Sequence, residues 1–352
     1  MPDSIGTTGR GDTPGVTGTV IGWDIGGVNT KAVRWPDLAL RSAPYEIQRN
    51  PAALAPVLER LGRELGATGE CAHAVTMTAE LSQAFRTKRE GVAFVLDAVV
   101  RAFPSSTVGV YAVGGEFLPP DEARRRPLEV AASNWAATAR LVADAEPDCV
   151  LVDIGTTSTD VIPVVGGQVS ALGWTDPDRL LSGELVYSGA VRTPAEALCA
   201  TVPLRGAPCA VSAEAFALIG DAHLWRGRIR PEDYSAPTPD GRPATREFAG
   251  ERLARVVCGD REMLDEEDVD AIADALIEAQ LRAVTAAIRR VRNRHPEVAV
   301  AVVTGLGDWI AAEAAERAGL RVRRLADRIG EASRTAPAAA VACLFAARVA
   351  VP

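Results

Sequence analysis

The chain carries one sequence pattern twice, as Asp24-Ile25-Gly26-Gly27-Val28-Asn29-Thr30-Lys31 and as Asp153-Ile154-Gly155-Thr156-Thr157-Ser158-Thr159-Asp160. Each copy follows an apolar run and begins with an aspartate that opens a glycine turn carrying hydroxyl or amide side chains. Because glycine has no Cβ, such a turn leaves backbone N–H groups open to a ligand, and phosphate suits them. Two such loops facing each other would bind a chain of phosphates and a divalent cation from both sides.

Length and composition limit the class of protein. At 352 residues the chain exceeds the usual size of a single hydrophobic core, so two domains are expected. It is 47% hydrophobic and 24% charged with a net charge of −8, which is typical of a globular protein. No basic stripe is present to bind nucleic acid, and the longest apolar run is too short to span a bilayer. We therefore expect neither nucleic acid nor a membrane as a partner, and the oligomeric state stays open.

The cysteines and histidines indicate the redox environment of the protein and the kind of metal site it could contain. The six cysteines form no C-x-x-C pair and no secretory signal is recognisable, a pattern typical of unpaired thiols in a reducing cytoplasm. No two of the three histidines share a metal-ligand spacing, which argues against zinc. A metal would be held by carboxylates and phosphate oxygens, and these ligands favour Mg²⁺.

The order of the apolar runs predicts an α/β protein, because strands are followed by helices in both halves. We expect a disordered tail over residues 1–18 and a first domain over 19–135. A second domain is expected over 136–335, with an inserted irregular region at about 170–260. The apolar residues 336–350 predict a terminal helix belonging to the first domain. A single helix is predicted over 128–144.

A third glycine loop, Thr304-Gly305-Leu306-Gly307-Asp308, lies between a predicted core strand and a helix. Its glycines would let a purine or another flat group lie on the backbone. A turn between a strand and a helix often needs glycine for its backbone conformation alone. This loop therefore indicates a ligand site only in combination with the two aspartate loops.

The loops assign roles to residues. Asp24 and Asp153 are the candidate Mg²⁺ ligands, and Asp153 could instead act as a general base. Lys31 would add a positive charge. The expected ligand-binding positions in the loops are Gly26, Gly27, Asn29, Thr30, Gly155, Thr156, Thr157, Ser158, Gly305 and Gly307. For either aspartate loop alone, an ordinary glycine hairpin turn is an equally good interpretation.

The three loops in this order resemble the superfamily of actin, sugar kinases and heat-shock chaperone ATPases, and within it the hydantoinase A and oxoprolinase branch. The resemblance implies two ribonuclease H-like domains with a ligand cleft between them. A narrower set of motifs is similar to the methanofuran biosynthesis synthase family, also described as a tetrahydromethanopterin-linked one-carbon pathway family. The motifs are Met77-Thr78-Ala79-Glu80-Leu81, Thr87-Lys88-Arg89-Glu90-Gly91-Val92, Ala132-Ser133-Asn134-Trp135, Thr175-Asp176-Pro177-Asp178-Arg179-Leu180, Glu184-Leu185-Val186-Tyr187-Ser188-Gly189, Arg192-Thr193-Pro194, Glu232-Asp233-Tyr234, Thr238-Pro239-Asp240-Gly241 and Cys258-Gly259-Asp260-Arg261-Glu262.

This resemblance implies a transferase. In methanogens the family member joins 5-(aminomethyl)-3-furanmethyl diphosphate to the phenol of γ-glutamyltyramine, which releases diphosphate and forms an aryl ether. A furfuryl C–O bond ionises readily once the leaving diphosphate is neutralised, and paired loops with Mg²⁺ would supply that neutralisation. The phenol needs a base or a nearby cation to react at neutral pH.

Further candidates complete the expected site. Asp153, Asp24 and Glu80 follow strands and could take the phenol proton, while Lys31 and Lys88 could bind diphosphate. Ser133 and Asn134 could bind ligand or could only hydrogen-bond a buried helix. Arg179 and Arg192 are expected to face the anionic cleft.

Other functions stay open at this point. A diphosphate-displacing transferase would not consume ATP, although ATP could fit between the loops. The wider superfamily offers an ATP-dependent small-molecule kinase or a hydantoinase/oxoprolinase-like amide hydrolase. A nucleotide switch that activates a dehydratase is a third class, and the missing cysteine cluster for an iron–sulfur centre argues against it.

Overall fold

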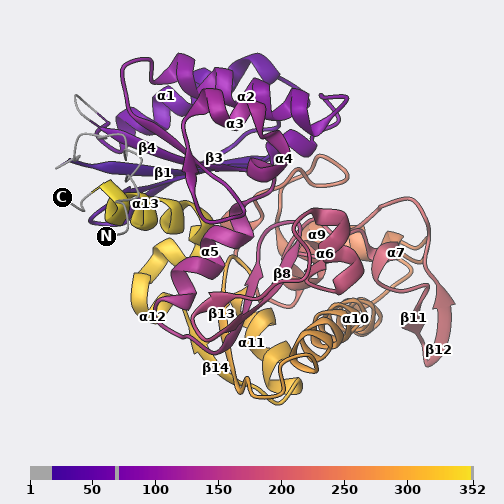
Figure 1. The fold of residues 1–352 in the computed structure, drawn as a ribbon. Coiled ribbons are helices and arrows are strands. Elements are labelled where there is room, and N and C mark those ends of the chain that lie inside the picture. Colours follow the sequence, from indigo (N-terminus) through magenta and orange to yellow (C-terminus); the bar gives the residue numbers. More distant parts are fainter. Residues whose placement is uncertain (1–17, 68–70, 350–352) are drawn as a thin grey trace, which may run out of the picture.

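The computed structural model describes residues 18–67 and 71–349. Apart from Gly18, the tail predicted over residues 1–18 lies outside the described residues. Two six-stranded sheets dominate the fold, and helices lie between the sheets and on their outer faces (Figure 1). Among the described residues, no helix is both long and apolar enough to cross a membrane.

The first sheet has the order β3-β2-β1-β4-β5-β6. Its first three strands form an antiparallel meander, β4 and β5 continue parallel to β1, and β6 is antiparallel to β5. The strands are β1 (Val20–Ile25), β2 (Asn29–Trp35), β3 (Ala39–Pro44), β4 (Ala72–Met77), β5 (Val108–Tyr111) and β6 (Phe117–Leu118). The outer face is covered by η1 (Pro51–Ala53), α1 (Leu54–Glu64), α2 (Lys88–Ala102), α3 (Pro120–Arg125) and α4 (Pro127–Val130) (Figure 1).

The second sheet repeats this plan in the order β10-β8-β7-β13-β14, with β9 also paired to β8. The strands β7 and β8 form an antiparallel pair, as β1 and β2 do, and β13 and β14 continue parallel to β7. The strands are β7 (Cys149–Ile154), β8 (Thr159–Val165), β9 (Gln168–Val169), β10 (Leu185–Val186), β13 (Val300–Thr304) and β14 (Arg321–Arg324). Its outer helices are α10 (Glu266–Arg292) and α11 (Asp308–Arg317). The molecule therefore consists of two ribonuclease H-like domains, as the resemblance implied.

Two helices, α5 (Asn134–Ala143) and α13 (Ala336–Val349), pack together between the sheets (Figure 1). Their apolar side chains share one core with inner-face residues of both sheets, among them Ala74 and Leu151. The helix α13 comes very close to β1, since a Cβ on Gly22 would lie 2.1 Å from the carbonyl oxygen of Ala338. Between β14 and α13 the chain forms α12 (Ala326–Ile329) and η4 (Gly330–Thr335). The shared core joins the domains at the base of the cleft.

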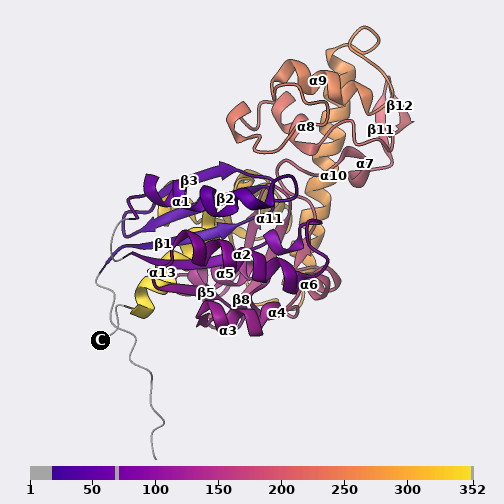
Figure 2. The ribbon, with the colours of Figure 1, turned by 90° about the horizontal axis from the view of Figure 1, so that it is seen from above.

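Residues 195–264 form a separate lobe on the far part of α10 (Figure 2). The lobe contains α7 (Ala195–Leu198), β11 (Thr201–Leu204), β12 (Ala207–Ala210), α8 (Ile219–Trp225), η3 (Pro231–Asp233) and α9 (Arg246–Arg255). We did not predict the β11–β12 hairpin, because its turn is made by Arg205 and Gly206 rather than by an asparagine–glycine pair. The lobe shares the apolar core of the second domain.

The single helix predicted over 128–144 is wrong, since the chain forms α4 and α5 with a break between them. Ala131 pairs with Met77 in an isolated parallel bridge, and Ala132 adopts a φ of 50°. A left-handed residue cannot continue a right-handed helix, so the chain turns before α5 begins. This turn places Ala132 and Asn134 on the wall of the cleft.

Candidate active site

A cavity of about 390 Å³ lies where the two aspartate loops meet. Residues from both domains line it, and most of the predicted site residues are among them. These are Asp24, Gly26, Gly27, Asn29, Lys31, Glu80, Asn134, Asp153, Gly155, Thr156, Thr157, Ser158, Arg179 and Gly305. Four predicted residues, Thr30, Lys88, Ser133 and Gly307, lie outside this lining.

The two loops have the same local geometry. In the first, the N–H of Gly26 donates to the carbonyl of Asn29 at 3.0 Å; in the second, the N–H of Gly155 donates to the carbonyl of Ser158 at 3.0 Å. The strands after the turns pair in the same register, so that Asp24 lies opposite Lys31 and Asp153 lies opposite Asp160. The repeat in the sequence is thus also a repeat in the structure. The two copies differ at the last position of the loop, which is Lys31 in the first and Asp160 in the second.

Asp24 and Lys31 form the charged pair of the first loop. The Lys31 Nζ lies 3.4 Å from Asp24 Oδ2, while Oδ1 of the same carboxylate is buried and has no hydrogen-bond partner among the described residues. A buried carboxylate oxygen with no donor is an open position for a cation or an N–H group. Thr30, the residue before Lys31, is fully buried and does not face the cavity.

Asp153 is the corresponding carboxylate of the second loop and is 6% exposed. Burial, and then the charge of Asp160, raise the pKa of Asp153 to about 7, although Lys31 acts in the opposite direction. The third loop comes directly against this side chain, since a Cβ on Gly305 would lie 2.5 Å from Asp153 Oδ1. Gly305 also has a φ of 92°, so only glycine suits this position. Gly307 instead packs beside the Ile154 side chain, where a Cβ would meet it at 2.6 Å.

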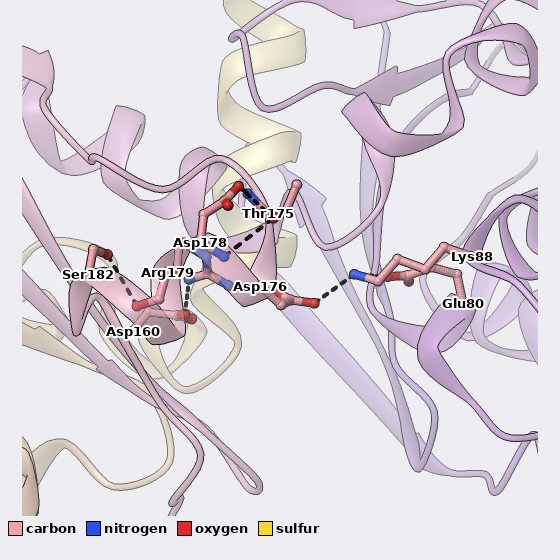
Figure 3. Close-up of polar contacts among 8 residues, drawn as sticks. All are labelled: Glu80, Lys88, Asp160, Thr175, Asp176, Asp178, Arg179 and Ser182. Atoms are coloured by element: carbon pink, nitrogen blue, oxygen red, sulfur yellow. Dashed lines mark hydrogen bonds and ion pairs between the residues drawn. The ribbon is translucent and has the colours of Figure 1, made fainter.

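A second charged group includes cavity-lining residues of both domains and joins these domains (Figure 3). Lys88 on α2 contacts Asp176 on α6 (Asp176–Ser182) at 2.7 Å, and its Nζ lies 3.7 Å from Glu80 Oε1. Glu80 belongs to η2 (Ala79–Leu81), directly after β4. Asp176 also contacts Arg179 at 2.9 Å, and Arg179 in turn pairs with Asp160. Lys88 is thus engaged with Asp176.

Two of the predicted residues have structural partners. The Arg179 guanidinium is 2% exposed, is held by Asp160 and Asp176, and lies 4.7 Å from the centre of the Trp135 ring. Ser133 is fully buried, where its hydroxyl contacts that of Thr76 at 2.9 Å and donates to the carbonyl of Tyr111 at 2.8 Å. Both side chains therefore fix the cleft wall.

The cavity also contains residues that we did not predict, above all Arg334 and Tyr187, in addition to the expected Arg192. Arg334 pairs with Asp233 of the lobe. The Arg192 guanidinium has no hydrogen-bond or ion-pair partner within the described part of the chain, so it remains open to an anion.

Ser235 of the lobe connects the two loops. Its carbonyl accepts a hydrogen bond from Asn29 Nδ2 at 3.2 Å, and its hydroxyl lies 3.4 Å from that of Thr156. Ser235 is distant in sequence from both loops, and although it directly follows the Glu232-Asp233-Tyr234 motif, nothing in that motif indicated a contact with either loop. Only the fold shows that the lobe reaches the site.

Gln280 lies in the middle of α10, is fully buried and hydrogen-bonds the segment that packs against the second loop. Its Nε2 donates to Ser188 Oγ at 2.9 Å and to the carbonyl of Gly189 at 2.7 Å, and its Oε1 lies 2.9 Å from His223 Nε2. Gly189 packs directly against the loop, since a Cβ there would meet the Thr157 nitrogen at 2.5 Å. The amide of Gln280 thus connects the lobe with the loop.

Protein ligands alone do not form a metal site here, because residues 18–67 and 71–349 contain no group of three or more His, Cys, Asp or Glu side chains placed to hold an ion. Mg²⁺, however, is often bound through one or two carboxylates and the phosphates of a substrate. The open Oδ1 of Asp24 and the carboxylate of Asp153 fit that donor set.

The hydantoinase/oxoprolinase family model matches residues 72–348. A Methanocaldococcus jannaschii protein named (4-{4-[2-(gamma-L-glutamylamino)ethyl]phenoxymethyl}furan-2-yl)methanamine synthase is 36% identical over 298 residues, which cover 84% of this chain and 88% of that protein. A Methanococcus vannielii protein of the same name is 34% identical over 48% of this chain and 75% of its own length.

Solved structures of similar topology include the ethanolamine utilization protein EutJ from Carboxydothermus hydrogenoformans. It has a TM-score of 0.48 and 11% identity, with 95% of this chain and 92% of that one covered. The ROK hexokinase from Thermus thermophilus has a TM-score of 0.41 and 18% identity, with 94% and 99% covered.

Proposed function

The chain belongs to the hydantoinase/oxoprolinase family and, within it, to the methanofuran biosynthesis synthases; from this premise we propose that it joins an aminomethylfuran-methyl diphosphate to the phenol of γ-glutamyltyramine or a similar tyrosine-derived acceptor. The bond between the furan methylene carbon and the diphosphate oxygen breaks, and a bond from that carbon to the phenol oxygen forms. The observation that carries the proposal is the 36% identity over 84% of the chain to a relative named for the product of this reaction.

The twin loops would bind the leaving diphosphate. Both turns line one cavity, and the cations that also line it include Lys31 at the end of the first loop and the unpaired Arg192, while Arg179 and Arg334 are held by carboxylates. Charge on the departing diphosphate is thereby balanced before the C–O bond breaks, which lowers the barrier to ionisation. Lys88, in contrast, is held by Asp176 and is a weaker candidate for diphosphate than the sequence indicated.

Mg²⁺ is part of the proposal, with Asp24 as its protein ligand beside the diphosphate oxygens. When bound, the ion would neutralise developing negative charge on the leaving group. Asp153 could be a second ligand or the base, and we favour the base, because a carboxyl whose pKa is about 7 is matched to proton transfer at neutral pH. It would accept the phenol proton as the ether bond forms.

The same loops could accept ATP, so the test must separate two reactions. The purified protein is incubated with ATP and Mg²⁺ alone, and in a second tube with the aminomethylfuran-methyl diphosphate, γ-glutamyltyramine and Mg²⁺. Diphosphate release and an aryl ether in the second tube only are expected. ADP in the first tube with no ether in the second would reject the synthase in favour of an ATP-dependent kinase or hydrolase.

A cytoplasmic location is also proposed. All six cysteines are free thiols in the structure, including the exposed Cys258. Unpaired cysteines are the ordinary state in a reducing compartment, which supports this location.

A further inference from the structure

Glu80 is a buried carboxylate that the proposed chemistry does not use. It is 2% exposed and lines the cavity, yet neither carboxylate oxygen has a hydrogen-bond partner among the described residues. Its backbone is held rigidly, since α2 packs so closely that a Cβ on Gly91 would lie 2.5 Å from Glu80 Cα. An unpaired buried carboxylate destabilises a fold, so a role with a ligand is the natural explanation.

The charges around Glu80 leave room for one more cation. Lys88 is 3.7 Å from Glu80 Oε1, too far for a hydrogen bond, because its ammonium is engaged with Asp176 at 2.7 Å. The connected group has three carboxylates, Glu80, Asp160 and Asp176, but only two cations, Lys88 and Arg179 (Figure 3). With every group ionised, one negative charge stays unbalanced, and Glu80 is the carboxylate that lacks a close partner.

We propose that Glu80 binds the primary ammonium of the aminomethyl group on the furan substrate. This inference rests on the proposed function, since that reaction supplies the amine. An ammonium offers three donors and a full positive charge, while a carboxylate is a pure acceptor, so the pair forms charge-assisted hydrogen bonds in a site shielded from water.

The position of Glu80 suits this role better than that of a base. Glu80 follows β4, which lies next to β1, and the N–H of Thr78 donates to the carbonyl of Ile25 in the first aspartate loop at 2.9 Å. Glu80 and that loop thus lie on neighbouring strand ends of one domain, where a single furan could reach both. Asp153 lies on the other domain, and this position suits a base that takes the proton of the second substrate, the phenol.

An amine-free analogue tests the inference. We would compare kcat/KM for the aminomethylfuran-methyl diphosphate and for the same diphosphate without the aminomethyl group, in the wild type and in Glu80→Gln. The wild type should prefer the amine by about 100-fold or more, since a buried group built for a charged partner rejects an analogue that lacks it. Glu80→Gln should lose most of that preference, because its kcat/KM for the amine substrate falls toward its value for the analogue. Asp97→Asn, an exposed acid on the same helix as Lys88, is the control and should behave as wild type.

The outcomes separate this inference from the proposed function. If the wild type turns over both substrates and Glu80→Gln keeps the full preference, the amine site is wrong and the synthase stands. If the wild type turns over neither, the synthase proposal fails, and calorimetry decides the amine site. Furfurylamine should then bind the wild type more tightly than 2-methylfuran does, and equal affinities, or unchanged furfurylamine affinity in Glu80→Gln, would overturn it. Should Glu80→Gln fail to fold in a thermal unfolding check, Glu80→Asp replaces it, and an undiminished amine preference there would count equally against the site.

Discussion

Lys88 on α2 and Asp176 on α6 lie 2.7 Å apart, and this ion pair crosses from one domain to the other beside the cavity. Both side chains are largely shielded, with exposed fractions of 23% and 17%. Asp176 also contacts Arg179, which is stacked on Trp135 at the end of the shared core. The pair therefore links the side of the cleft to the packing of the protein interior.

Replacing Lys88 by methionine should destabilise the protein by about 2–4 kcal/mol. The substitution removes the cation nearest to the buried Glu80 and leaves Asp176 with Arg179 alone, and an uncompensated buried charge is costly. Chemical denaturation followed by circular dichroism would measure the effect. Arg124→Met, which removes a partner of the exposed Asp97, is the matched control and should change stability little. Equal effects for the two variants would contradict a structural role for the interdomain pair.

Asp153→Ala should lower the rate of aryl ether formation by about 10³-fold or more, because the phenol would lose its proton acceptor. The protein should remain folded with unchanged or slightly increased thermal stability, since a buried carboxylate with a raised pKa is removed. Diphosphate release and the melting temperature would be measured side by side. Asp144→Asn, an exposed acid on the same domain, serves as the control. Near-normal turnover by Asp153→Ala would exclude this residue from the mechanism.

Local sequence was sufficient for the parts of the site that one segment builds. The aspartate loops carry their glycines, hydroxyls and charges within a few residues, so their shape and their meeting in a cleft were predictable. The contacts between segments were not. Nothing near Ser235 marks it as the bridge between Asn29 and Thr156, and nothing near Lys88 shows that its partner is Asp176. Such pairs arise from tertiary packing, and neither the hydrophobic periodicity nor the turn residues of the sequence predict them.

Gln280 lies on the long helix α10, and nothing in the sequence indicated its hydrogen bonds to the segment that packs against the second loop. Gln280→Leu should loosen the second aspartate loop, because Ser188, Gly189 and His223 each lose a buried hydrogen-bond partner. We expect kcat to fall more than about tenfold and amide hydrogen exchange at residues 155–158 to accelerate. The exposed Gln168→Leu is the control. A loss of global stability with unchanged relative exchange in the loop would show that Gln280 acts only as a core residue.

The buried position of Glu80 also predicts how stability depends on pH. Burial is the main cause that raises the pKa of Glu80 from 4.5 to about 7, against the smaller opposing effect of Lys88. Between these values the folded protein keeps a proton that the unfolded chain has released, so this contribution to stability is complete below pH 4.5 and is lost as the pH rises through 7. Glu80→Gln cannot ionise, and its stability relative to the wild type should therefore rise by roughly 3 kcal/mol between pH 4 and pH 8. Because the other titrating groups are common to both proteins, denaturant unfolding across this range isolates the one carboxyl. A difference that does not vary with pH would mean that the pKa of Glu80 is the same in the folded and the unfolded protein.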